Sequence, residues 1–270
     1  MRKFFRTPKG ALTLVFVPLL ALGAIAEGWS AVLPHVLAAV LGASLMELIV
    51  ARIQRRAIRW PSSAILSGTI VAFVLDPVTP HIATLAIGGL ATLTKHLVAT
   101  RRGHIFNPAA LALLISIPLF ATGQSWWGTL PDLPWPFIGV LLVGGAFVVD
   151  RINKFPLVLS FMATYFTIFT VTSIVDPTGV AEMFRTPFVQ SALFLALFML
   201  TDPPTSPSRE RDQVLLGALV GVTSCVAQLA GIGQAYLLVG VLVGNVALVA
   251  LRYVRTARAA LVPATLRREG

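Results

Sequence analysis

The sequence predicts an all-α membrane protein with ten transmembrane helices, arranged as a 5+5 inverted repeat. Three features predict this fold: the composition, the number of apolar segments, and a short motif that occurs in both halves of the chain. Of 270 residues, 56% are hydrophobic and only 12% are charged, whereas soluble domains carry about 25% charged residues. We therefore expect a single membrane domain over residues 1–270, with repeat one at about 11–121 and repeat two at about 136–254.

The expected helices are the apolar segments of the chain. If the N-terminus is cytoplasmic, every Lys and Arg except Arg185, of 21 in all, falls on the cytoplasmic side of the membrane. Because basic residues near short loops stay on that side, we predict that both termini are cytoplasmic and that the protein spans the cell (inner) membrane. The segments are 11–27, 30–51, 62–75, 82–99, 106–121, 136–149, 156–174, 187–201, 213–230 and 234–251.

The net charge of +10 follows from this orientation signal, so we expect contact with the lipid bilayer and no nucleic-acid partner. The single cysteine, Cys225, allows no disulfide or cysteine-based metal site within the chain. His96 and His104 flank a cytoplasmic loop, which argues against haem ligation from mid-helix positions. No Ser-His-Asp set, phosphate-binding glycine loop or pair of carboxylates occurs. The sequence therefore predicts no catalytic residues and no metal site.

A short motif closes an apolar segment in each half of the chain. It reads LDPVTP at residues 75–80 and TDPPTSP at residues 201–207. Proline lacks a backbone donor and disfavours helical backbone at the residue before it, so Asp76 and Asp202 should each follow a helix end. With five helices in each repeat, the two copies lie at opposite faces of the membrane.

The two segments that lead into the motif are short. Residues 62–75 rise roughly 21 Å and residues 187–201 roughly 23 Å, against a hydrocarbon core of about 30 Å. Short, proline-terminated segments at corresponding places of inverted repeats indicate a ligand site near the membrane midplane. The alternative is that both helices are tilted or flanked by embedded loops.

Few polar side chains fall within the apolar segments. Glu47 and Lys95 lie near cytoplasmic helix ends, where we expect their charged groups to reach the interface. Asn245 should bond a neighbouring helix, with a ligand as the alternative. The loop 122–135 is expected to be exposed on the outer side. Interfacial rings are expected at the outer-loop tryptophans Trp29, Trp126, Trp127 and Trp135.

Three stretches resemble a known family, the D subunit of Rnf electron-transport complexes and the B subunit of the sodium-pumping NADH:quinone reductase (the RnfD/NqrB family). Residues 198–207 read FMLTDPPTSP and resemble the family's FMATDPVTSP, with Leu200 in place of Ala and Pro204 in place of Val. Residues 103–109 read GHIFNPA and resemble its N-x-FNPA stretch, which follows a lysine-bearing helix, here with Lys95. Residues 66–68 (LSG) and the C-terminal helix with Asn245 also fit.

The resemblance implies a ten-helix, inverted-repeat subunit that relays electrons across the membrane through bound flavin (riboflavin or FMN), with coupling to ion transport. It implies part of a redox-driven oxidoreductase or translocase complex rather than a complete enzyme. The implied partners are other membrane subunits and subunits that carry flavin or iron–sulfur clusters. A transporter or channel for a small polar solute or flavin, on the same scaffold, is the alternative function.

The family attaches FMN covalently to a Thr in a Ser-Gly-Ala-Thr stretch between helices five and six. The corresponding residues 121–130 read ATGQSWWGTL and lack that stretch. We therefore predict non-covalent flavin, held in a cleft that offers stacking surface and hydrogen-bond donors. The expected cofactor-binding residues are Phe106, Asn107, Thr201, Asp202 and Asn245.

Overall fold

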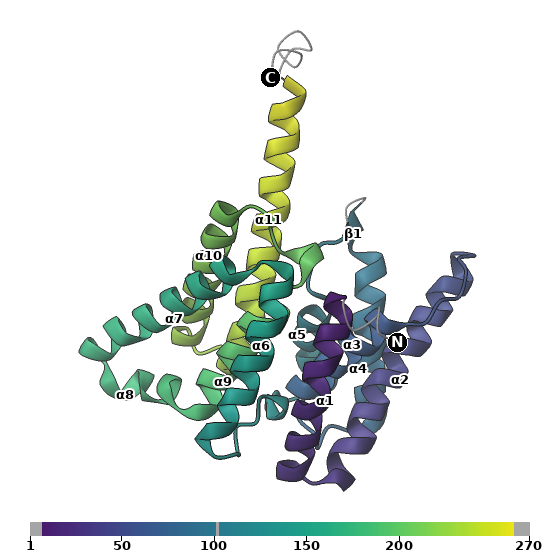
Figure 1. Ribbon diagram of the computed structural model, residues 1–270, viewed down its shortest axis with the longest axis horizontal. Helices are drawn as coiled ribbons and strands as arrows, with labels where there is room; N and C mark the ends of the chain where they lie inside the picture. Colours follow the sequence, from purple (N-terminus) through teal and green to yellow (C-terminus); the bar gives the residue numbers. More distant parts are fainter. Residues whose placement is uncertain (1–6, 101–102, 262–270) are drawn as a thin grey trace.

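The computed structural model describes residues 7–100 and 103–261, and most of these residues are helical (Figure 1). A helix lies at each of the predicted apolar segments. Predicted placements of basic residues within 1–6, 101–102 and 262–270 fall outside the described residues. The α-helices are α1 (Pro8–Glu27), α2 (Trp29–Ile53), α3 (Ser62–Val74), α4 (His81–Leu97), α5 (Pro108–Phe120), α6 (Ile138–Ile152), α7 (Phe155–Val175), α8 (Pro177–Val180), α9 (Thr186–Phe194), α10 (Glu210–Leu229) and α11 (Tyr236–Leu261).

Short elements connect these helices. The π-helix η5 (Leu195–Met199) continues α9, and the strands β1 (Ala99–Thr100) and β2 (Gly103–His104) form a small antiparallel hairpin between α4 and α5. The 3₁₀ turns are η2 (Trp127–Thr129), η3 (Trp135–Phe137), η4 (Ala181–Phe184), η6 (Pro203–Thr205) and η7 (Gly233–Ala235).

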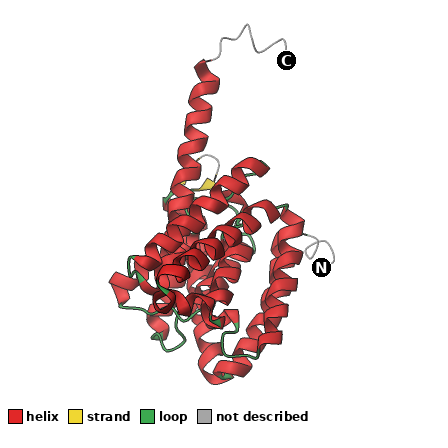
Figure 2. Ribbon diagram, turned by 90° about the vertical axis from the view of Figure 1, so that its left-hand side faces the viewer, coloured by secondary structure: helices red, strands yellow, loops and turns green. Residues whose placement is uncertain are grey.

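Within the part of the chain that the structure describes, five helices are long and apolar enough to cross a membrane, judged by length and composition: α1, α2, α7, α10 and the Gly233–Ala257 stretch with α11. Large aliphatic side chains on α2 and α7 point outward, among them Leu41, Ile49 and Ile174. Shorter apolar helices cover Ser62–Val74, Pro108–Phe120 and Thr186–Met199. These features describe an all-α membrane protein. The end of α11 extends beyond the neighbouring helices in both views (Figure 1, Figure 2).

Two helix pairs flank a central group of helices. α2 packs most extensively on α4, and α7 packs on α10 almost as closely; in Figure 1 the two pairs lie on opposite sides of α1, α3, α5 and α6. Glycine permits each close approach. A Cβ on Gly42 would lie 1.9 Å from the Leu85 carbonyl oxygen, and one on Gly217 would lie 2.4 Å from that of Leu157. The glycine at position 217 of α10 is therefore explained by helix packing.

Aromatic side chains fill the space between the central helices. The Phe16 ring lies 5.4 Å from both Phe73 and Phe198, and Phe73 lies 5.2 Å from Trp127 in an edge-to-face arrangement. Phe194 stands 5.1 Å from Phe198. These centroid distances are those of favourable aromatic pairs. The cluster ties α1 to both of the short helices that precede the Asp-Pro motifs.

The helix that leads to Asp202 changes its winding just before the motif. α9 ends at Phe194, and the five residues of η5 follow as π-helix. A short π-helix within an α-helix arises from one extra residue in a turn and occurs frequently at functional sites. Here it ends three residues before Asp202.

The segment after α5 differs from the sequence-based expectation. The loop was expected to be exposed, with Trp126 and Trp127 at the membrane interface, yet the two side chains are only 3% and 1% exposed. Trp127 Nε1 donates to the Ala72 carbonyl at 2.6 Å, and Leu75 forms a β-bridge with Gln124. This segment folds under the end of α3 because its amides satisfy carbonyl groups left free at that helix end.

Candidate functional site

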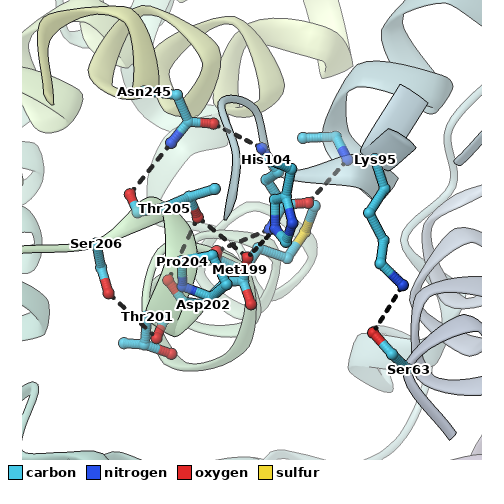
Figure 3. A network of polar contacts seen from close by, with 12 residues as sticks. Ser63, Lys95, His104, Met199, Thr201, Asp202, Pro204, Thr205, Ser206 and Asn245 are labelled. Carbon is cyan, nitrogen blue, oxygen red and sulfur yellow. Dashed lines mark hydrogen bonds and ion pairs between the residues drawn. The ribbon is translucent and has the colours of Figure 1, made fainter. Parts of the chain in front are cut away.

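The second Asp-Pro motif forms a compact turn in which Asp202 is the main acceptor. Thr205 N donates to the Asp202 carbonyl at 3.0 Å, and Thr205 Oγ1 donates to Asp202 Oδ2 at 3.2 Å. His104 Nε2, from strand β2, lies 3.0 Å from the same carboxylate oxygen. Figure 3 shows Asp202, His104 and Thr205 converging. The two halves of the chain therefore meet at this carboxylate.

Two asparagines join this turn to the start of α5. Asn107 caps α5, because its Oδ1 accepts from Ala110 N at 3.0 Å, while its Nδ2 donates to the Met199 carbonyl at 2.9 Å. Asn245 Oδ1, from α11, accepts from Asn107 N at 2.7 Å, and Asn245 Nδ2 donates to the Thr205 carbonyl at 3.4 Å. Asn245 thus bonds neighbouring segments, as expected. Both side chains are buried, and their hydrogen bonds connect the turn to α5 and α11.

Basic side chains bind the backbone carbonyls of the same motif. The Arg252 guanidinium donates to the carbonyls of Pro204 and Ser206 at 3.2 and 3.4 Å. Lys154, in the loop between α6 and α7, donates through Nζ to the Pro207 carbonyl. Burial lowers the pKa of Lys154, and the nearby charge of Arg252 lowers this pKa further. Proline has no backbone N–H, so the motif has few donors of its own for these carbonyls. Two basic side chains from other parts of the chain supply the donors instead.

A cavity of about 1250 Å³ lies beside this turn. Its volume exceeds the roughly 300–1,000 Å³ of most small-molecule sites. Apolar side chains form part of its wall, including Leu12, Leu66, Val148 and Phe198, and polar groups come from helices α1 to α4, the loop after α2, β2, the N-cap of α5 and the Asp202 turn. The polar and charged lining residues are Thr7, Lys9, Glu47, Arg56, Arg59, Ser62, Ser63, Ser67, Lys95, His104, Asn107, Thr201 and Asp202.

A second charged cluster borders the cavity. Glu47 Oε2 lies 3.1 Å from Lys95 Nζ and 3.2 Å from His96 Nε2, and Lys95 also donates to Ser63 Oγ at 3.3 Å. Figure 3 shows the Lys95–Ser63 contact on the side away from the Asn245–Thr205 contact. The expectation that Glu47 and Lys95 reach the interface stays a prediction, and the structure adds that the two groups form an ion pair. They pair because α2 packs on α4, which places the two partly buried groups together.

The structure brings three of the five predicted site residues to the cavity: Asn107, Thr201 and Asp202. Phe106 packs against the hydrophobic core, and Asn245 lies behind the turn, bonded to Asn107 and Thr205. Thr201 Oγ1 donates to the Leu197 carbonyl at 2.8 Å. The cofactor role of these five residues stays a prediction.

Sequence reasoning overlooked His104 as the partner of Asp202 and the 56–63 segment as part of the same cavity. The position of His104, three residues before Asn107 in the GHIFNPA stretch, was the available signal. For the 56–63 segment, the available signal was the stretch WPSS at residues 60–63, which directly precedes a short apolar helix. Among the described residues, no group of three or more His, Cys, Asp or Glu side chains is arranged to hold a metal ion.

Comparison with known proteins bears on the second half of the chain in particular. The sequence model of the NQR2, RnfD, RnfE family matches residues 133–260, a range that contains the 198–207 stretch. The D subunit of the ion-translocating oxidoreductase complex of Aliivibrio salmonicida (strain LFI1238) is 22% identical, over 82% of this chain and 84% of its own. The resemblance to this family is therefore confirmed. With the apolar helices described above, it identifies a multi-pass membrane protein.

Proposed function

We propose that this chain is a membrane subunit of an ion-translocating oxidoreductase complex and relays electrons through a flavin held in the cavity beside Asp202. The observation that carries the proposal is the position of the FMLTDPPTSP stretch. Phe198, Thr201, Asp202, Pro203 and Pro204 of this stretch line the large cavity, together with His104 and Asn107 from the second matching stretch. The family match and the name of the relative support the assignment to such a complex.

The cavity suits a flat ring system with polar edges. The Phe198 ring and the aliphatic side chains of Leu66 and Val148 provide an apolar wall. Asp202 has a second carboxylate oxygen that accepts no hydrogen bond from the described residues, and the hydroxyls of Ser62 and Ser67 are likewise without a described partner. Bound flavin would supply one- and two-electron transfer, while these side chains would orient its ring and hold the polar edge.

Burial of Thr129 supports non-covalent retention. Thr129 is completely buried, whereas Thr122 is partly exposed and its Oγ1 lies 2.7 Å from Ser116 Oγ. A modifying enzyme needs access to the hydroxyl that it esterifies, and Thr129 does not offer this access. We therefore keep the prediction that flavin (riboflavin or FMN) binds without a covalent bond.

We also propose the ten-helix inverted repeat with both termini cytoplasmic in the inner membrane. It is supported by the matched packing of α2 on α4 and of α7 on α10, and by the equivalent contacts of α1 with α3 and of α6 with α9. The partners would be other membrane subunits and the flavin- or iron–sulfur-bearing subunits of the complex. A channel for a small polar solute or flavin is the second candidate, favoured by the size of the cavity.

The visible spectrum of gently purified protein tests the proposal. We expect flavin absorption near one equivalent, released as free flavin by acid, and no fluorescent band on denaturing electrophoresis. A fluorescent band would contradict the non-covalent attachment. A colourless protein, purified with its natural partner subunits, would contradict the electron-transfer role and favour the channel.

A further inference from the structure

The lining of the cavity changes in character from its inner end to its mouth. At the inner end, Asn107 and Thr201 are only 3% and 2% exposed. At the mouth, Arg56 and Arg59 are exposed and the Trp60 ring is 80% exposed. All five residues line the same cavity. A ligand that fills it would therefore have one end among apolar and buried polar groups and the other among basic side chains.

The cations at the mouth lack the partners that the other charged lining residues have. Lys95 pairs with Glu47, and His104 pairs with Asp202. Lys9, Arg56 and Arg59 form no ion pair with any described residue. Four lining residues are Lys or Arg and only two carry carboxylates. The mouth therefore carries unbalanced positive charge next to an apolar chamber.

The start of α3 adds to this charge. The helix begins at Ser62 with no side-chain cap from Pro61. Ser62 N donates to the Trp60 carbonyl at 2.9 Å, and Pro61, Ser62 and Ser63 line the cavity next to Arg59 and Trp60. The helix dipole reinforces a positive potential at that point. Arginine side chains recognise phosphate oxygens through paired N–H donors.

From this arrangement we infer that Lys9, Arg56, Arg59 and the first turn of α3 form a subsite for a phosphate ester attached to an apolar body. This inference rests on the proposed function, which places a flavin in the cavity, and it makes the bound form a flavin mononucleotide rather than riboflavin. The ring lies at the inner end beside Phe198 and Asp202, and the phosphate lies at the mouth. An anionic phospholipid headgroup has the same chemistry and is the other source of such a group.

The test compares FMN and riboflavin binding to the full-length protein after removal of its flavin, in nanodiscs of neutral phosphatidylcholine. We expect FMN to bind about tenfold more tightly than riboflavin, a preference that falls as the salt concentration rises. The double variant Arg56→Gln/Arg59→Gln should lose this preference and keep the riboflavin affinity. The matched control is Arg52→Gln/Arg55→Gln, at the end of α2 and in the loop that follows it, because Arg52 and Arg55 do not line this cavity.

The outcomes separate the inference from the proposed function. Equal binding of FMN and riboflavin to the wild type would overturn the phosphate subsite and leave the flavin site in place. No binding of either flavin would overturn the proposed function. If phosphatidylglycerol then stabilised the wild type and not the Arg56→Gln/Arg59→Gln variant, the subsite would stand with a lipid as its ligand. An equal loss of preference in the Arg52→Gln/Arg55→Gln control would overturn it, because the effect would reflect loop charge alone.

Discussion

The two Asp-Pro motifs end their helices in different surroundings. At the first, Val74 O accepts from the amides of Ser125 and Trp126, both at 3.1 Å, and Asp76 Oδ1 accepts from Val78 N at 3.0 Å. At the second, the carboxylate of Asp202 faces His104 and Thr205 and lines the large cavity. The same local sequence thus produces a covered helix end in one half and a cavity wall in the other. Tertiary neighbours decide which copy is available to a ligand.

The largest expected difference between the copies is in cofactor retention. Asp202→Ala removes the acceptor of both His104 and Thr205, and we expect flavin affinity to fall about 10- to 100-fold, the usual cost of lost charge-assisted hydrogen bonds. Asp76→Ala, the matched change in the first copy, should leave flavin affinity within about twofold. Flavin titration of the two variants measures both effects.

Asp212 lies in α10, shortly after the second Asp-Pro motif, but it is an unsuitable control for the Asp202→Ala experiment. It is buried, and its Oδ1 accepts from Arg255 Nη2 at 2.7 Å. Equal flavin affinity in the Asp76→Ala and Asp202→Ala variants would remove the functional distinction between the copies.

The second prediction concerns the stability of the covered end. A Cβ on Gly128 would lie 2.3 Å from the Phe73 ring, so Gly128→Ala should lower the free energy of unfolding by about 1–3 kcal/mol. Gly139→Ala, in α6 with nothing within 4 Å, serves as the control and should be neutral or slightly stabilising. Thermal unfolding in detergent measures the difference. If both variants melted at the same temperature, the 123–130 segment would not be packed under α3 as described.

The smallest expected effect is a pH dependence of stability near the second Asp-Pro motif. The pKa of Lys154 is lowered in the folded protein by burial and by Arg252. The unfolded chain therefore binds more protons than the folded one between that lowered pKa and the ordinary value of 10.5, and stability rises with pH across this window. The wild type should gain stability relative to Lys154→Met as the pH is raised within it, by less than about 1 kcal/mol. Parallel melting curves for the two proteins, followed against pH, would show that Lys154 stays fully protonated in the fold.

The helix positions were predictable because each depends on a local signal. Apolar runs marked the helices, and proline marked the helix ends before Asp76 and Asp202. The confirmed family resemblance also pointed to the stretch around Asp202. What the sequence showed there was a helix end followed by a turn, and the structure adds its partner His104.

The cavity and the burial of the 123–130 segment were not predictable in the same way. Arg56 and Asp202 line one cavity through the packing of helices that are distant in the chain. Trp127 was assigned to the membrane interface by a statistical preference of tryptophan. That preference contains no information about the Ala72 carbonyl at the end of α3, which accepts a hydrogen bond from the Trp127 indole.

The π-helix before Asp202 has a consequence for the proposed inverted repeat. One additional residue in a helical turn rotates everything that follows by about 100°. Side chains before Leu195 and after Met199 therefore lie on faces that a continuous α-helix would not give them, whereas α3 is α-helical throughout. A superposition of the two halves should therefore align either the Asp-Pro turns or the helices before them. Both should align at once only when a single-residue gap is placed at 195–199. Deletion of one residue there would restore the α-helical register and turn Asp202 away from His104.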